Sequence, residues 1–221
     1  MTSSSSLADY YTEKPSYEKV SRGRLEAIRR LMPAARPLTV LDIGCGSGTL
    51  GEALKSDPKV RVFGLDVAPQ AVEQAAQRLD GAWVADITSE DPWPPEVAGQ
   101  RYDLIVISEV LEHLFFPEHL LKAARSLLAP GGSIVITVPN ILFWRNRLRL
   151  LGGKFAYEDS GLMDRGHIHF FSWQSFRDLI RQEGLRIDAS AHVVPTRIVR
   201  PFADLLPGLF AQQFAVRISL V

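Results

Sequence analysis

Asp42 and the glycines that follow it form the first group of residues in this 221-residue chain that could do chemistry. The carboxylate ends an apolar segment, and glycines stand at positions 44, 46 and 48. Glycine permits positive φ and lets a ligand come close to the main chain. Burying a carboxylate is costly unless it finds a partner, so we expect Asp42 to meet a cationic or hydrogen-bond-donating ligand.

Carboxylate and imidazole side chains gather in two later segments. One segment follows an apolar run at 102–107, and the other precedes a helical pattern that begins near residue 172. Side chains of these types exchange protons near neutral pH and bind divalent cations. The candidates for acid–base or metal chemistry are Glu109, Glu112, His113, Asp164, His167 and His169.

Strand-like and helix-like patterns alternate through the first 140 residues. This alternation predicts parallel strands joined by right-handed helical crossovers, which is a doubly wound α/β sheet. The predicted strands are 38–43, 60–67, 82–87, 102–107, 133–138, 185–194 and 214–221, and the predicted long helices are 17–32, 68–79, 117–129 and 172–182.

Polar residues stand at the carboxyl ends of four of these strands. They are Asp42, Asp66, Asp86 and the pair at 108–109. Ligands of doubly wound sheets bind beyond the carboxyl ends of the strands, at the point where the strand order reverses. We therefore expect these residues to converge on one ligand site.

Two ligands compete for that site. Residues 46–51 match the dinucleotide fingerprint in form, and Asp66 follows at about the distance of a ribose-binding carboxylate. Asp42 argues against a dinucleotide, because its charge would repel a pyrophosphate. A ligand with a cationic amino-acid end and a nucleoside end suits both carboxylates, and S-adenosylmethionine is such a ligand. NAD is the more distant alternative.

Composition limits the remaining classes of function. The 25 basic and 25 acidic side chains give a net charge of zero, which lends no support to nucleic-acid binding. The one cysteine, Cys45, excludes an internal disulfide and fits a reducing compartment.

No apolar run approaches the roughly 18 residues of a membrane span, and the first residues do not resemble a secretory signal. We expect a cytoplasmic protein with a mobile tail at 1–15 and one domain at 16–221.

Five segments in order resemble the motifs of class I S-adenosylmethionine-dependent methyltransferases. The pattern Glu109-x-x-Glu112-His113 is similar to that of ubiquinone-biosynthesis O-methyltransferases, and the segment 139–153 resembles the methionine-biosynthesis protein W type. The resemblance covers roughly residues 20 to 195. It implies a Rossmann-like seven-stranded sheet in the order 3-2-1-4-5-7-6, with the last strand antiparallel. The segments are 40–50, 64–67, 85–87, 102–113 and 127–132.

The resemblance also implies roles for the matching residues. The glycine turn contacts the methionine part of the cofactor, and Asp42 lies near its ammonium group. Asp66 accepts hydrogen bonds from both ribose hydroxyls, which one carboxylate can do. Asp86 accepts from the adenine amino group, and Ile87 covers the ring. The implied cofactor-binding residues are Asp42, Gly44, Cys45, Gly46, Asp66, Val67, Asp86, Ile87 and Ser108.

Methyl transfer to a hydroxyl needs a base or a metal to take the proton. We expect Glu109, His113 and His169 to be the catalytic residues. The pattern Glu109-x-x-Glu112-His113 with a later histidine is similar to the metal site of small-RNA 2′-O-methyltransferases. Glu109, Glu112, His113 and His169 are therefore candidate ligands of a divalent cation. Metal-free acid–base use, substrate orientation and structural packing stay open for the same residues.

The expected function is S-adenosylmethionine-dependent methyl transfer to an oxygen of a small-molecule or glycan-linked acceptor. A non-catalytic S-adenosylmethionine-binding regulatory or partner protein of the same fold is the alternative, and an NAD-dependent oxidoreductase is a distant one. The basic stretch at 145–154 has three interpretations. It is a solvated cover, a lid whose arginines meet an anionic group of the acceptor, or a peripheral attachment to acidic lipid.

Overall fold

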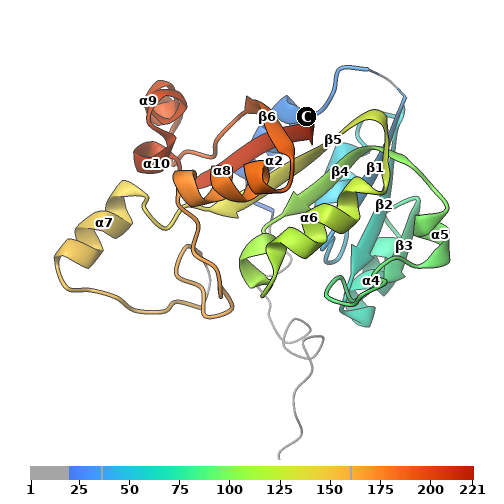
Figure 1. Ribbon diagram of the computed structural model, residues 1–221, viewed down its shortest axis with the longest axis horizontal. Coiled ribbons are helices and arrows are strands. Elements are labelled where there is room, and N and C mark those ends of the chain that lie inside the picture. Colours follow the sequence, from blue (N-terminus) through green and yellow to red (C-terminus); the bar gives the residue numbers. More distant parts are fainter. Residues whose placement is uncertain (1–19, 36, 160) are drawn as a thin grey trace, which may run out of the picture.

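The computed structural model of the chain describes residues 20–35, 37–159 and 161–221 (Figure 1). The predicted tail at 1–15 lies outside the described residues. Seven strands form one sheet in the order β3-β2-β1-β4-β5-β7-β6, which confirms the predicted order. The strands are β1 (Leu38–Ile43), β2 (Val60–Asp66), β3 (Gly81–Val84), β4 (Tyr102–Ser108), β5 (Leu128–Pro139), β6 (Leu185–Ser190) and β7 (Gln213–Leu220).

The first five strands are parallel to their neighbours, and β7 runs antiparallel between β5 and β6. The antiparallel last strand is therefore as predicted. Strands β1 and β4 lie side by side although two strands separate them in the sequence. The chain order reverses there, which is where a doubly wound sheet binds its ligand.

Helices cover both faces of the sheet. On β4, Leu104 and Val106 face one layer while Ile105 and Ile107 face the other, and all four are completely buried. A strand buried on both faces reads as a continuous apolar run, which explains the pattern at 102–107. In Figure 1 the helices α6 and α8 lie in front of the sheet and α2 lies behind it. One layer holds α2 (Arg22–Leu31), α3 (Thr49–Leu54) and α4 (Pro69–Ala76), and the other holds α5 (Pro95–Ala98), α6 (Pro117–Arg125) and α8 (Trp173–Gln182).

Several predicted boundaries shift: the strand predicted at 185–194 ends at Ser190, and the helix predicted at 117–129 ends at Arg125. Two other shifts have local reasons. The third strand ends at Val84 instead of residue 87, because the Asp86 side chain accepts from the backbone N–H and the hydroxyl of Thr88 and turns the chain. Helix α2 begins at Arg22, where the hydroxyl of Ser21 caps it by accepting from the N–H of Arg24.

Between β5 and α8 the chain makes a long excursion that carries helix α7 (Trp144–Leu151). Asn140 and Phe171, at its two ends, form a parallel β-bridge, and the N–H of Ile141 donates to the carbonyl of Phe171 at 3.1 Å. Before β7 come η3 (Arg197–Val199), α9 (Arg200–Leu205) and α10 (Pro207–Phe210), which were not predicted. None of the helices in the described ranges is both long and apolar enough to cross a membrane.

Candidate cofactor and catalytic site

The glycine turn after β1 is fixed against two neighbouring strands. The backbone N–H groups of Gly44 and Cys45 both donate to the carbonyl of Leu65, at 2.8 and 2.9 Å. Gly44 has a φ of 75°, and a Cβ added to it would lie 2.5 Å from Cγ2 of Val110. No larger residue fits here, so at the carboxyl edge of the sheet the turn presents main-chain atoms that no side chain covers at this position.

Asp66 is held by two backbone donors. Its Oδ2 accepts from the N–H of Gly46 at 2.8 Å, and its Oδ1 accepts from the N–H of Ala68 at 3.0 Å. The side chain is buried, and its orientation is set by both bonds. Each carboxylate oxygen can accept a second hydrogen bond, so Asp66 is suited to a pair of neighbouring hydroxyls.

Asp42 is buried with an unsatisfied oxygen. The residue is 1% exposed, and its Oδ2 has no hydrogen-bond partner within the described part of the chain. Burial, and then the charge of Asp66, raise the pKa of Asp42 to about 7, against the opposing charge of Arg24. A cationic group of a ligand would supply the missing partner, as the sequence predicts.

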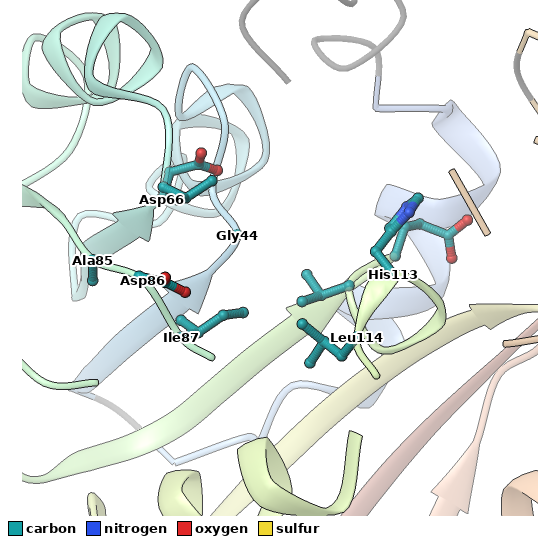
Figure 2. A pocket seen from close by; sticks show the side chains of 10 residues that line it. Gly44, Asp66, Ala85, Asp86, Ile87, His113 and Leu114 are labelled. Carbon is teal, nitrogen blue, oxygen red and sulfur yellow. The ribbon is translucent and has the colours of Figure 1, made fainter. Parts of the chain in front are cut away.

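A cavity opens between the carboxyl ends of the central strands (Figure 2). Figure 2 shows Asp66, Asp86 and Ile87 on one side of it and His113 and Leu114 on the other. Of the polar residues expected to converge from four strand ends, Asp66, Asp86 and Glu109 line the cavity, and Asp42 and Ser108 do not. The complete lining is Gly44, Asp66, Val67, Ala85, Asp86, Ile87, Glu109, Val110, His113 and Leu114.

Two predicted cofactor residues have side chains engaged elsewhere. The thiol of Cys45 packs in the core against Gly64, where burial raises its pKa well above the ordinary value. The hydroxyl of Ser108 lies 3.0 Å from the hydroxyl of Thr137 on β5. Any contact of these two residues with a ligand in the cavity would therefore come from their main chain.

Glu109 is fixed from three directions. Its Oε1 accepts from the hydroxyl of Thr137 at 3.0 Å, and its Oε2 accepts from Nε2 of Gln213 at 2.7 Å. Nη1 of Arg24 lies 3.6 Å from the same Oε2. Burial raises the pKa of Glu109, while Arg24 and Thr137 oppose the shift. Glu109 also has a φ of 59°, which is rare for a residue with a side chain and is typical of functional turns.

Arg24 is a site residue that the sequence reasoning missed. It lies on α2, its side chain is only 16% exposed, and it reaches Glu109 across the layers. Ala27, Ile28 and Leu31 are the buried residues of the same helix. Arg24 stands at the matching helical spacing, so an arginine on the apolar face of a predicted helix was the available signal.

Glu112 forms the centre of a second cluster beside the cavity. It lies in η2 (Leu111–His113), it is fully buried, and neither of its carboxylate oxygens has a hydrogen-bond partner in the described ranges. Nε2 of His167 lies 3.9 Å from its Oε1, and the rings of His113 and His167 are 4.9 Å apart. Burial, and then the charge of Glu109, raise the pKa of Glu112 well above its ordinary value. One ligand atom from each of Glu112, His113 and His167 lies within 4.8 Å of the others.

His169 does not join this cluster. Its Nε2 lies 3.2 Å from the carbonyl of Phe115, and its ring stacks on Phe171. The reason is a backbone turn, since the N–H groups of Ile168 and His169 both donate to the carbonyl of Glu112. The turn brings the side chain of His167 next to Glu112 and leaves the side chain of His169 outside the cluster. Glu109 is engaged by Thr137, Gln213 and Arg24 as described, so the expected four metal ligands do not converge.

The tautomer of His113 follows from its neighbour. Its Nδ1 lies 2.8 Å from the carbonyl of Gly166, and a carbonyl only accepts, so Nδ1 carries the proton. In the neutral ring the lone pair is then on Nε2. A residue with this tautomer can accept a proton or bind a cation at Nε2.

Comparison with known proteins identifies the family. Residues 17–190 match the family described as a methyltransferase domain. The chain belongs to this methyltransferase family. Its fold and motifs are those of the class I S-adenosylmethionine-dependent methyltransferases.

Curated relatives of this methyltransferase act in different reactions. A ubiquinone biosynthesis O-methyltransferase from Xanthomonas axonopodis pv. citri is 30% identical over 172 residues, which is 75% of this chain and 69% of that protein. A trans-aconitate 2-methyltransferase from Methylobacterium nodulans is 35% identical over 114 residues, or 50% of this chain and 42% of that protein. The methyltransferase spans less than two thirds of the length of several such relatives, including a Cereibacter sphaeroides ubiquinone biosynthesis O-methyltransferase that it covers to 60%.

Solved structures of low sequence identity share the fold. A chain from the complex between the Haloferax volcanii Trm112 methyltransferase activator and the putative methyltransferase has a TM-score of 0.62 at 18% identity, and 96% of each chain is covered. Magnesium protoporphyrin IX methyltransferase from Synechocystis with bound SAH has a TM-score of 0.58 at 17% identity, covering 84% of this chain and 75% of that one.

Proposed function

We propose that this methyltransferase transfers the methyl group of S-adenosylmethionine to an oxygen of a small-molecule or glycan-linked acceptor. The unsatisfied, buried carboxylate of Asp42 beside Asp66 carries the proposal. It fits a ligand that has a cation at one end and a nucleoside at the other. Oxygen is favoured as the acceptor atom because several relatives are named O-methyltransferases.

The polar residues around the cavity divide the cofactor between them. Asp42 would bind its ammonium group, and Arg24, whose charge acts on Asp42, would bind its carboxylate. Asp66, whose orientation is set by the N–H groups of Gly46 and Ala68, would accept from the ribose hydroxyls. Asp86 and Ile87 would contact the adenine from the opposite end of the lining.

S-adenosylmethionine, when bound, would supply a methyl group that a nucleophile can attack, with S-adenosylhomocysteine leaving as the thioether. Displacement mainly requires that the nucleophile be aligned with the methyl group. His113 lines the cavity and presents Nε2, so it is placed to take the proton of an acceptor hydroxyl. Glu109 also lines the cavity, in an orientation fixed by Thr137, Gln213 and Arg24, and would help to orient the acceptor. His169 would support the loop instead of touching the acceptor.

A divalent cation is the alternative use of His113. The donor set of Glu112, His113 and His167 fits one, since two buried carboxylate oxygens lack partners and two imidazoles face them. Such an ion would acidify an acceptor hydroxyl. Under the metal-free use, His113 alone takes the proton and Glu112 keeps the neighbouring imidazoles in place.

Calorimetry followed by turnover tests the proposal. The chain should bind S-adenosylmethionine and S-adenosylhomocysteine, and it should not bind NAD. Radiolabelled S-adenosylmethionine and a panel of phenols, polyols and glycosides should then give a labelled product whose new bond is to oxygen. Binding of NAD alone would refute the proposal. Cofactor binding without transfer to any acceptor would favour the non-catalytic alternative.

A further inference from the structure

Helix α7 exposes its apolar side chains and buries a polar one. Asn146 is 5% exposed and its Nδ2 donates to the carbonyl of Ile141, whereas Leu148 and Leu151 are 59% and 85% exposed. With 3.6 residues per turn, Trp144, Leu148 and Leu151 share the face opposite Asn146. A surface helix normally turns its apolar stripe toward the core. Leu148 and Leu151 on this stripe point away from the protein, whereas Trp144 is half-buried beside Phe143.

Basic residues flank the apolar stripe on both sides. Arg145 and Arg149 follow one edge and Arg147 follows the other, by the same helical spacing. The guanidinium of Arg145 lies over the ring of Trp144, at 5.3 Å. The sequence from 140 to 157 contains no acidic residue and adds Lys154, and Glu158 follows. Arg149 pairs with Glu158 at 2.7 Å, and Arg147 donates to the carbonyls of Leu142 and Gly208, so Arg145 and Lys154 are the cations of this segment without a described ion-pair or backbone partner. The face is apolar along its centre and keeps an excess of positive charge along its edges.

Neighbouring elements extend this face. Nη2 of Arg147 donates to the carbonyl of Gly208 at 3.2 Å, which ties α7 to α10. Figure 1 shows α7, α9 and α10 together at one end of the molecule, beyond the carboxyl end of β5. Large apolar side chains on or beside these elements are exposed, among them Phe155, Ile198, Phe202 and Leu205, at 57%, 83%, 56% and 77%.

We propose that α7, together with the exposed apolar side chains on and beside α9, docks on an anionic lipid bilayer. A short helix with Trp and Leu on one face and arginines beside it is typical of segments that lie in the membrane interface. The arginine stems can lie along the acyl region while the guanidinium groups reach lipid phosphates. A second copy of the chain fits less well, because two such positively charged faces would repel each other.

Docking in this way places the carboxyl edge of the sheet, and with it the cavity, toward the bilayer. If the proposed methyl transfer holds, the acceptor class that this favours is an amphiphile whose tail stays in the membrane. That consequence rests on the proposed function, whereas docking itself does not.

Vesicle co-flotation of the full chain, without cofactor, tests the docking. The chain should float with vesicles of phosphatidylcholine mixed with phosphatidylglycerol, should stay behind with pure phosphatidylcholine, and should be released as salt screens the charges. The double variant Leu148→Ser/Leu151→Ser should lose about tenfold or more in vesicle affinity. Arg145→Gln should lose about fivefold.

Matched controls are available on other surfaces. Leu220→Ser changes a leucine that is 45% exposed on β7, and Lys59→Gln removes an exposed cation next to β2. Both should bind vesicles as the parent chain does. Thermal melting should show every variant folded, and calorimetry should show S-adenosylmethionine affinity unchanged in all of them, which separates a failure of docking from a failure of the proposed function.

Three results would overturn the proposal. The parent chain would not bind the mixed vesicles, or the α7 variants would bind them as well as the controls do. Alternatively, size-exclusion chromatography would show a dimer that the double variant converts to a monomer, with no vesicle binding, and the face would then be a self-association surface.

Discussion

The guanidinium of Arg24 lies 3.6 Å from the carboxylate of Glu109, which joins helix α2 to the positive-φ turn after β4. The same guanidinium lowers the pKa of Asp42 and of Glu112 against the effect of burial. One side chain from the first described helix thus acts on three carboxylates that come from different positions along the sheet edge.

Replacing this cation should weaken cofactor binding. In Arg24→Met the carboxylate of the methionine part loses its counter-charge, and Asp42 becomes harder to keep ionised for the ammonium group. We expect S-adenosylmethionine affinity to fall tenfold or more, equivalent to about 1.4 kcal/mol or more, measured by calorimetry. Arg22→Met is the control, because Arg22 is exposed on the same helix. Equal affinity of the two variants would remove Arg24 from the site.

Asp42→Asn should stabilise the protein without ligand while it abolishes cofactor binding. The pKa of Asp42 is about 7 in the folded chain and about 3.8 when exposed, so the folded state binds more protons between these values. Stability is therefore lost as pH rises from about 4 to 7, by up to about 4 kcal/mol. The free energy of unfolding of Asp42→Asn, measured with urea, should not show this fall between about pH 4 and 7. A parallel pH profile for parent and variant would contradict the assignment.

His113→Gln should slow methyl transfer far more than it affects cofactor binding. A positioned base contributes about 10²- to 10⁴-fold, so kcat should fall by that amount while S-adenosylmethionine affinity changes by less than about twofold. His169→Ala tests the role predicted for that residue from the sequence, and its smaller expected effect reflects its contacts with Phe115 and Phe171. His119→Gln, exposed on α6, is the control for a surface imidazole.

Divalent cations should raise the melting temperature through the Glu112 cluster. A ligand that binds only the folded state stabilises it in proportion to the logarithm of its concentration above Kd. We expect Mn²⁺ or Zn²⁺ to raise Tm in the parent chain and to have no effect in Glu112→Gln. Glu118→Gln, which changes a half-buried acidic residue in the first turn of α6, should respond as the parent does. A parent chain whose Tm ignores both ions would favour the metal-free use of His113.

His192 should make the protein sensitive to acid. Burial against Trp173 and Phe214 lowers its pKa to about 4. The unfolded chain binds this proton below about pH 6.5, so stability present above that value is lost as pH falls toward 4, by up to about 3 kcal/mol. In His192→Phe, the free energy of unfolding should fall less than in the parent chain as pH decreases from about 6.5 to 4. An equal fall in the variant would assign this pH dependence to other groups.

The sheet and the cofactor edge could be predicted because their signals are local. Gly44 follows β1, Asp66 ends β2 and Asp86 lies two residues beyond β3, and the parallel arrangement alone carries them to one edge. Alternating strands and helices fixed that arrangement without knowledge of any side-chain contact. Ser172 likewise caps α8 as its sequence position indicates.

Residues placed by long-range packing could not be found in this way. Arg24 reaches Glu109 across 85 positions of sequence, and His167 meets Glu112 only because one carbonyl accepts from two successive N–H groups. His167 and His169 were both candidates from the sequence, and the metal prediction chose His169. The backbone turn instead brings His167 to Glu112. Helices α9 and α10 were missed because Pro201 and Pro207 interrupt the helical pattern of apolar residues. Each proline lies in the first turn of its helix, where proline is well tolerated.

The β-bridge between Asn140 and Phe171 means that the chain leaves the sheet and returns to it at one place. The amide of Asn140 secures this bridge by donating to the carbonyl of Ala211. The end of the segment near Ile168 and His169 is held a second time, by the carbonyl of Glu112, whereas the part that carries α7 lies between these attachments. That part can therefore lengthen or shorten while the strands and the cofactor edge keep their positions.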